Sequence, residues 1–257
     1  MTVSLYALSG FFVGLLVGLT GVGGGSLMTP LLVLLFGVHP ATAVGTDLLF
    51  AASTKTVGTL VHGFARNIDW RIVGLLMAGS VPATAATLVV LSTFDLSGGT
   101  AHHLITLSLG AVLLVTSAFL LGARKMRARY ADRVSQLDDR IVAVLTIVLG
   151  AVMGVLVTMT SVGAGAIGVT VLFFLYPRMP ASRIVGSDIA HAVPLTLVAG
   201  AGHWYLGSVD WALLGPLLMG SLPGIVVGSK LVGRIPDGAV RTALALVLIA
   251  VAIKLMT

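Results

Sequence analysis

Two aspartates occur in the same short context at distant points of the chain. Asp47 follows Thr46 and Asp188 follows Ser187, and each pair comes directly after a glycine. Each aspartate lies about 8–10 Å into a predicted apolar helix, at 1.5 Å per residue. A carboxylate at that depth indicates exchange of protons or binding of a cation. The alternative is that each caps a helix start, where Asp is favoured, and the sequence leaves both interpretations open.

Two further titratable side chains stand close to these aspartates along the chain. Lys55 is the only lysine deep inside a predicted apolar helix, about 20 Å along it. Its ammonium can bind an anion, pair with a carboxylate or extend toward the membrane surface. His191 follows Asp188 by three residues, on a similar helix face, and histidine titrates near neutral pH. We therefore assign Asp47, Asp188 and His191 to proton or ion coupling.

Glycine-rich breaks interrupt two apolar runs, reading GLTGVGGGS at residues 18–26 and TMTSVGAGA at residues 158–166. Peptide N–H groups at the start of a helix bind anions. The alternative is close helix packing through small residues, which is common in membranes. A break at the head of two unusually short apolar segments favours a binding site. The predicted substrate-binding residues are Gly23, Gly24, Gly25, Ser26, Thr46, Lys55, Gly163, Ala164, Gly165 and Ser187.

The composition places these residues in a membrane protein. Of 257 residues, 57% are hydrophobic and 9% are charged, whereas a soluble domain carries roughly 25% charged residues. The net charge of +6 comes from basic residues in short loops, so we expect a lipid bilayer and no nucleic acid as partner. The chain has no cysteine. We predict no catalytic residue, metal site or cofactor, and we interpret the first apolar run as a retained helix, not a signal peptide.

Apolar segments of helical length follow one another along the whole chain. They are Val3–Leu19, Leu27–Gly37, Ala41–Val61, Trp70–Leu91, His103–Gly122, Arg140–Met159, Ile167–Tyr176, Arg183–Gly202, Trp211–Val232 and Ala239–Met256. A span needs about 20 residues, so the second and seventh are short. Each short segment follows a glycine break. We predict that it forms a hairpin with the segment before it, either spanning the membrane or re-entrant.

The two halves of the chain form an internal repeat. Residues of special type recur at offsets of 140 and then 141 residues: Thr20, Gly23, Pro40, Asp47, His62, Asp69, Ser80 and Pro82 correspond to Thr160, Gly163, Pro180, Asp188, His203, Asp210, Ser221 and Pro223. Such a duplication is typical of repeat architectures. We divide the chain into repeat 1 (1–122), a basic linker (123–139) and repeat 2 (140–257).

The basic loops predict the orientation of both repeats. The central linker carries five Lys and Arg residues before residue 134, so we expect it in the cytoplasm of a multi-pass inner-membrane protein. Counting spans outward from it puts the 63–69 turn inside and the corresponding 204–210 turn outside. The repeats are therefore predicted to be inverted. The fold class is all-α integral membrane, each repeat being a glycine-broken hairpin plus three transmembrane helices, with eight full spans and up to ten.

The motifs GVGGGS…VGTDL and SVGAGA…VGSDI, with matching Pro-Ala turns, resemble the TauE/SafE family of sulfite and organosulfur-anion exporters. The resemblance covers nearly the whole chain. It implies a cofactor-free secondary carrier for a small anion, such as a sulfur oxyanion or organosulfonate. Many members of that family are expected to have a small polar residue where Asp47 and Asp188 stand here, which indicates proton or ion coupling.

We predict a transporter that exports a small anion by alternating access, and not an enzyme. A passive channel for anions or small solutes is the alternative. An intramembrane enzyme is disfavoured because no serine stands in a G-x-S-G context with a plausible base. The hydrophobic exterior also permits a homodimer.

Overall fold

A computed structural model gives the fold of residues 2–20, 25–64, 67–94, 98–134, 138–163, 165–231 and 237–256. The described residues form ten α-helices. They are α1 (Thr2–Thr20), α2 (Gly25–Phe36), α3 (Pro40–Phe64), α4 (Trp70–Ser92), α5 (Gly99–Val134), α6 (Asp139–Thr160), α7 (Ala166–Leu175), α8 (Ala181–Tyr205), α9 (Trp211–Leu231) and α10 (Asp237–Met256). The prediction of an all-α membrane protein is confirmed.

Most helices match the predicted apolar segments to within a few residues, with one clear difference in α5. This helix continues past the apolar segment to Val134, so residues 123–134 of the predicted linker are helical. The apolar part of α5, His102–Gly122, is one of five stretches long and apolar enough to cross a membrane among the described residues. The basic residues that follow simply extend the same helix, because Arg, Lys and Ala all favour helix.

Two helix pairs join the first half of the chain to the second through the same kind of contact. On α1, Gly10 and Gly14 lie against backbone carbonyls of α9, and on α6, Gly150 and Gly154 lie against those of α4. A side chain at any of these glycines would collide with the facing helix. Small residues four apart let membrane helices approach closely, where dispersion contacts and not water exclusion hold them together. The glycine pairs of α1 and α6 are separated by the same 140-residue offset found in the sequence repeat.

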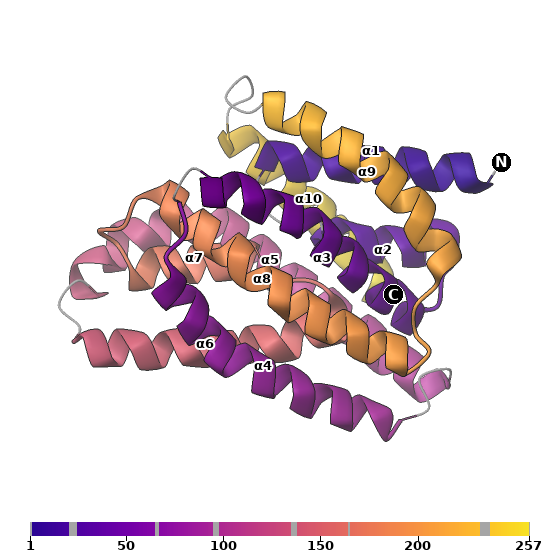
Figure 1. Cartoon of the computed structure of the whole chain (residues 1–257), viewed down its shortest axis with the longest axis horizontal. Helices are drawn as coiled ribbons and strands as arrows, with labels where there is room; N and C mark the ends of the chain where they lie inside the picture. Colours follow the sequence, from indigo (N-terminus) through magenta and orange to yellow (C-terminus); the bar gives the residue numbers. More distant parts are fainter. Residues whose placement is uncertain are drawn as a thin grey trace.

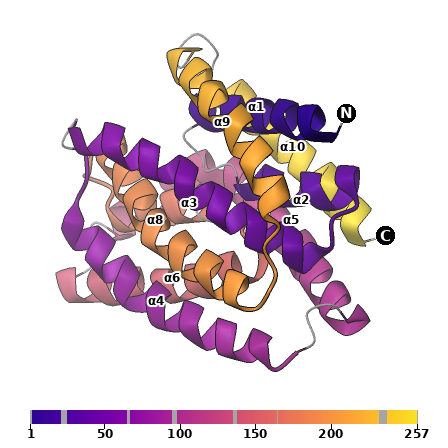
Figure 2. The same cartoon turned by 45° about the vertical axis from the view of Figure 1, so that its right-hand side comes forward.

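Corresponding helices also pack against one another in the middle of the molecule. Helix α3 lies beside α8, and α5 lies beside α10. Figure 1 shows α3 and α8 crossing the centre, with α1 and α9 at one edge and α4 and α6 at the opposite edge. The view in Figure 2 keeps the same order. Each half of the chain therefore needs the other to complete its packing.

The outer surface of the molecule is apolar and its interior contains polar groups. Large side chains such as Val3, Phe12, Val144 and Leu246 are about half exposed or more, while Asp47 and Asp188 are almost fully buried. Water would oppose this distribution, whereas lipid favours it. The multi-pass membrane location is therefore supported by packing as well as by composition.

Helices α2 and α7 are too short to cross a membrane. With 12 and 10 residues, they extend about 18 and 15 Å, near half of a ~30 Å hydrocarbon core. The break before α7 has special backbone geometry: Ser161 is left-handed, with φ 58°, and Gly163 and Gly165 have φ 112° and 117°. L side chains rarely adopt such angles, so glycine is required at the last two positions. The break thereby ends α6 and starts α7.

Candidate functional site

The Asp47 side chain is fully buried and is bonded to the beginning of α2. One carboxylate oxygen, Oδ2, accepts hydrogen bonds from the Thr29 N–H at 3.2 Å and from the Thr29 hydroxyl at 2.5 Å. The other oxygen, Oδ1, has no hydrogen-bond partner among the described residues. Asp47 lies seven residues after Pro40, the first residue of α3. It therefore does not cap α3, and instead satisfies a backbone group of a neighbouring helix.

Asp188 occupies the corresponding position of α8, seven residues after Ala181. Its carboxylate oxygen Oδ1 packs directly on Gly168 of α7, where any side chain would collide with it. Its second oxygen, Oδ2, is buried without a hydrogen-bond partner among the described residues. Like Asp47, it is inside its helix, so the capping interpretation fails for both. Each aspartate faces the half-length helix that precedes its own helix in the chain.

Lys55 lies among these acidic residues in the protein interior, with 6% of its surface exposed. It interacts electrostatically with Asp188 and, more weakly, with Asp47. Its charge also acts on His191. A buried ammonium is stable only when opposite charge or hydrogen-bond acceptors surround it. The structure therefore brings together four of the predicted residues, Asp47, Lys55, Asp188 and His191, around the two half-length helices.

The two buried histidines are held by hydrogen bonds from other helices. His191 Nε2 is 2.9 Å from the Ser80 hydroxyl of α4. His203 Nε2 is 2.9 Å from the Thr158 carbonyl of α6. A carbonyl only accepts, so this nitrogen of His203 carries the proton. The hydrogen bond of His191 thus goes to Ser80, and its predicted relay partner Asp188 lies one helical turn away on the same helix.

Thr46 and Ser187 form a crossed pair of bonds between the halves of the chain. The Thr46 hydroxyl accepts a hydrogen bond from the Asp210 N–H at 3.0 Å. The Ser187 hydroxyl accepts one from the Asp69 N–H at 2.8 Å. Each bond joins segments that the orientation analysis places on the same membrane side. Both predicted substrate-binding hydroxyls are therefore engaged in holding the two halves together.

The predicted caps at the starts of α4 and α9 are present. Asp69 accepts hydrogen bonds from the Arg71 and Ile72 N–H groups, and Asp210 does the same for residues 212 and 213. The tryptophans that follow, Trp70 and Trp211, are more than half exposed. Asp69 also pairs with Arg183 at 3.4 Å. These residues anchor helix ends and lie apart from the buried charges.

The glycine breaks are described only in part. Gly23, Gly24 and Ala164 lie outside the described residues. Gly25 and Ser26 open α2, and Gly165 directly precedes α7. Two first-turn N–H groups of α7 are already bonded within the break, Ile167 to the Gly163 carbonyl and Val169 to the Gly165 carbonyl. These two N–H groups are therefore engaged within the chain.

Three polar residues of the cluster were missed by the sequence analysis: Thr29, Ser80 and Ser161. Thr29 follows the first glycine break by one helical turn, which was a usable signal. Ser80 belongs to a matched pair in the repeat. Ser161 had no such signal, because a glycine, Gly21, stands at its counterpart. Its hydroxyl interacts with the Asp47 carboxyl across the two halves of the chain.

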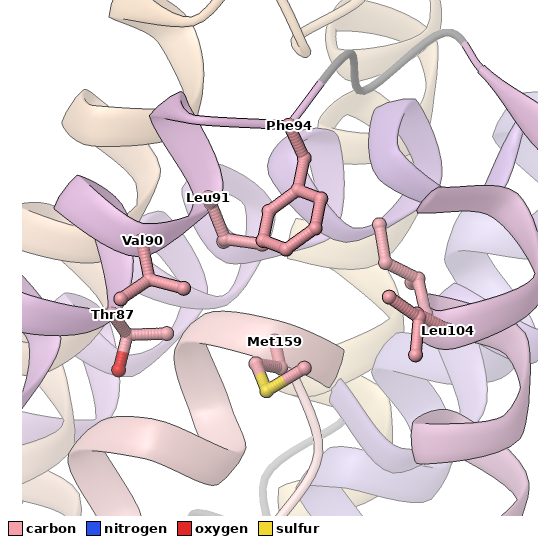
Figure 3. Close-up of a pocket in the computed structure, with 7 residues that line it drawn as sticks. Thr87, Val90, Leu91, Phe94, Leu104 and Met159 are labelled. Atoms are coloured by element: carbon pink, nitrogen blue, oxygen red, sulfur yellow. The ribbon is translucent and has the colours of Figure 1, made fainter. Parts of the chain in front are cut away.

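A separate cavity of about 80 Å³ lies between α4, α5 and α6. Figure 3 shows Phe94 and Leu91 directed toward Leu104 and Met159 around it. The single hydroxyl in its lining, that of Thr87, is bonded to the Ala83 carbonyl at 2.8 Å. The cavity therefore offers an anion neither charge nor a free donor, and it is not the candidate site.

No group of three or more His, Asp or Glu side chains arranged to hold a metal ion occurs among the described residues. The rings of His39 and His102 contact each other, with centroids 5.2 Å apart. Half-length helices that start beside buried, opposite charges are typical of secondary transporters. Fold and site are thus those of a class of protein: the helical membrane transporters.

Comparisons with known proteins agree with this class. The family described as Sulfite exporter TauE/SafE matches residues 6–255. The Probable membrane transporter protein YjnA of Bacillus subtilis is 37% identical over 260 residues, covering 100% of both chains. The Probable membrane transporter protein MJ0441 of Methanocaldococcus jannaschii is 23% identical over 240 residues, covering 88% of this chain and 84% of the relative. No solved structure matches significantly.

This chain belongs to the TauE/SafE family, and it is a membrane transporter and not an enzyme.

Proposed function

We propose that this transporter moves a small anion, sulfite or an organosulfur anion, by alternating access between two inverted halves. The observation that carries the proposal is the position of Lys55. It is buried beside Asp188 and Asp47, the residues that contact the half-length helices α7 and α2. One cationic side chain and two helix starts of positive dipole supply what an anion needs in a dry interior. Membership of the sulfite exporter family TauE/SafE supports sulfite as the first substrate to test.

The substrate would lie between the starts of α2 and α7, beside the Lys55 ammonium. Thr46 and Ser187, bonded to Asp210 and Asp69, would act as joints between the halves. Alternating access requires such contacts to break and form in turn on the two sides. Asp188, which faces Lys55, would carry the coupling proton with His191 nearby. The basic end of α5 would lie in the cytoplasm and the protein in the inner membrane.

Sulfite counterflow in proteoliposomes of the purified protein tests the proposal. Saturable exchange of labelled sulfite, inhibited by one anion class among sulfonates, thiosulfate and acetate, is the expected result. Lys55→Gln should remove exchange, whereas Thr146→Val, on α6 and bonded to Tyr176, should retain it. Flux that rises linearly with concentration and shows no exchange would indicate a channel. Absence of flux for every sulfur anion in folded protein would overturn the substrate assignment.

A further inference from the structure

The environment of Asp47 differs from that of Asp188 in one respect that determines what each can bind. Of the two aspartates, Asp188 interacts more strongly with Lys55. Asp47 is surrounded by hydroxyl oxygens, from Thr29 of α2 and from Ser161 at the end of α6. The two aspartates occupy matching positions in the repeat, but their neighbours are not equivalent: the residue matching Thr29 is Val169, and the residue matching Ser161 is Gly21. Of the two aspartates, Asp47 therefore lies in an oxygen-rich pocket among the described residues, and both halves of the chain contribute to it.

Two oxygen atoms of this pocket have no hydrogen-bond partner among the described residues. They are Asp47 Oδ1 and Ser161 Oγ, both buried. Asp47 is fully inaccessible and Ser161 is 4% exposed. Leaving such groups unpaired in a protein interior is costly, and each orphaned buried group calls for a partner. The Ser161 hydroxyl lies close to the Asp47 carboxyl but not within hydrogen-bond distance of it, so a small ion between Asp47 Oδ1 and Ser161 Oγ would contact both.

The end of α6 adds negative potential at the same place. Ser161 directly follows Thr160, the last residue of α6, so the negative end of the helix dipole is directed at the pocket. The left-handed backbone of Ser161 is unusual for a residue other than glycine. Such strain is retained where surrounding structure fixes it, often at ligand sites. Here it occurs at the residue whose hydroxyl lies close to Asp47.

The buried charges do not balance when both aspartates are ionised. Among the described buried residues, the acidic side chains are Asp47 and Asp188, and the basic aliphatic side chain is Lys55. Two ionised carboxylates and one ammonium leave one negative charge uncompensated. Either a proton on Asp188 or a monovalent cation at Asp47 would neutralise it. A single carboxylate with neutral oxygens suits a monovalent ion better than Ca²⁺, which takes 6–8 oxygen ligands, commonly several of them carboxylates.

We infer that Asp47, Ser161 and the hydroxyl of Thr29 form a binding site for a small monovalent cation, sodium being the ion to test. The Thr29 hydroxyl donates its proton to Asp47 and keeps lone pairs for the ion. Unwound backbone and helix carboxyl ends coordinate sodium in other transporters with broken helices. This inference rests on the proposed carrier function and adds a cation at Asp47, bound by residues of both halves, to the proton proposed at Asp188.

The test is equilibrium binding of labelled sodium to the purified full chain in detergent, without substrate. Thermal unfolding in sodium chloride is measured in parallel against choline chloride at equal ionic strength. Saturable sodium binding and a sodium-specific rise in unfolding temperature are expected, because a ligand that binds only the folded state stabilises it. Asp47→Asn should abolish both effects. Ser161→Gly, which keeps the left-handed backbone available, should weaken sodium binding about ten- to a hundredfold.

Matched variants separate loss of the site from loss of the fold. Thr29→Val should weaken sodium binding, and Thr29→Ser, which keeps the oxygen, should restore it. Thr146→Val, on α6 far along the chain from the pocket, should bind sodium as the parent does. No sodium binding by the parent, or full binding by Asp47→Asn, would overturn the inference, as would stabilisation that follows pH and ignores sodium. Sulfite counterflow reports independently on the carrier function, so the failure of one proposal is distinguishable from that of the other.

Discussion

The Thr46 hydroxyl accepts a hydrogen bond from the Asp210 N–H at 3.0 Å, across 164 residues of sequence. Its counterpart in the repeat, Ser187, accepts one from the Asp69 N–H at 2.8 Å, across 118 residues. The first bond joins α3 to the residue that precedes α9. The second joins α8 to the residue that precedes α4. Because Asp69 and Asp210 also cap those helices, one residue in each half serves both its own helix and the other half.

These crossed bonds should be measurable as stability. Thr46→Val and Ser187→Ala should each lower the free energy of unfolding by about 1–3 kcal/mol, because each leaves a partly buried N–H unpaired. Thermal unfolding in detergent is the measurement. The conservative variants Thr46→Ser and Ser187→Thr should stay near the parent. Equal stability of Thr46→Val and Thr46→Ser would show that the bond contributes nothing.

Gly168 is expected to be intolerant of substitution because Asp188 packs on it. Gly168→Ala should displace the Asp188 carboxylate, lower stability by about 1–3 kcal/mol through overpacking and strongly reduce transport. Gly74→Ala is the control, since Gly74 lies in a helix and a methyl group there would meet open space. That variant should be neutral or slightly stabilised, because alanine favours helix over glycine. A functional Gly168→Ala protein would contradict the importance of this contact.

Asp188→Asn tests proton coupling. The amide cannot exchange a proton, so we expect the variant to fold and to bind the anion but to lose its dependence on the pH gradient. Transport in proteoliposomes with and without an imposed gradient is the measurement, with anion exchange at equal pH as the internal control. Gradient-driven flux equal to that of the parent would remove Asp188 from the coupling role.

Lys55 should behave as part of a buried charge network. Lys55→Gln leaves Asp188 without its electrostatic partner and should destabilise the fold by roughly 3–5 kcal/mol. Adding Asp188→Asn removes the uncompensated charge, so the double variant should recover much of that stability, yet it should not bind the anion. Unfolding and anion binding measured on all three variants form a double-mutant cycle. Additive effects on stability would show that the two residues do not interact.

His39, in the loop between α2 and α3, provides a prediction on pH. Burial, and then the nearby His102, lower the pKa of His39 below its usual 6.5. The folded state therefore binds fewer protons than the unfolded state as the pH falls past 6.5, and folding loses stability there. His102→Ala should raise the pKa of His39 toward its ordinary value, but not fully, because burial remains. NMR titration of labelled histidines measures this, and an unchanged His39 titration would refute the effect of His102.

Much of the architecture could be predicted from the sequence because its determinants are local or periodic. Apolar runs of helical length predicted the helices, and the glycine breaks predicted where α2 and α7 begin. The pairing of Asp69 and Asp210 with their helix starts followed from capping preferences over three residues. The length of α5 was underestimated because hydropathy ends at Gly122, whereas helix propensity continues through the basic residues.

The same sequence predicted which residues carry charge in the interior, but not what each one contacts. Asp47 and Asp188 look equivalent in the repeat, and Thr46 and Ser187 look like ligands beside them. The packing of one half on the other decides these contacts. It places the Thr46 hydroxyl on the Asp210 N–H and the Ser187 hydroxyl on the Asp69 N–H. It also brings Lys55 to Asp188 and Ser161 to Asp47. Local sequence pattern determines the helices because the hydrogen bonds of a helix join residues four positions apart. These contacts between the halves join residues more than a hundred positions apart, so they depend on how the glycine-packed helices cross.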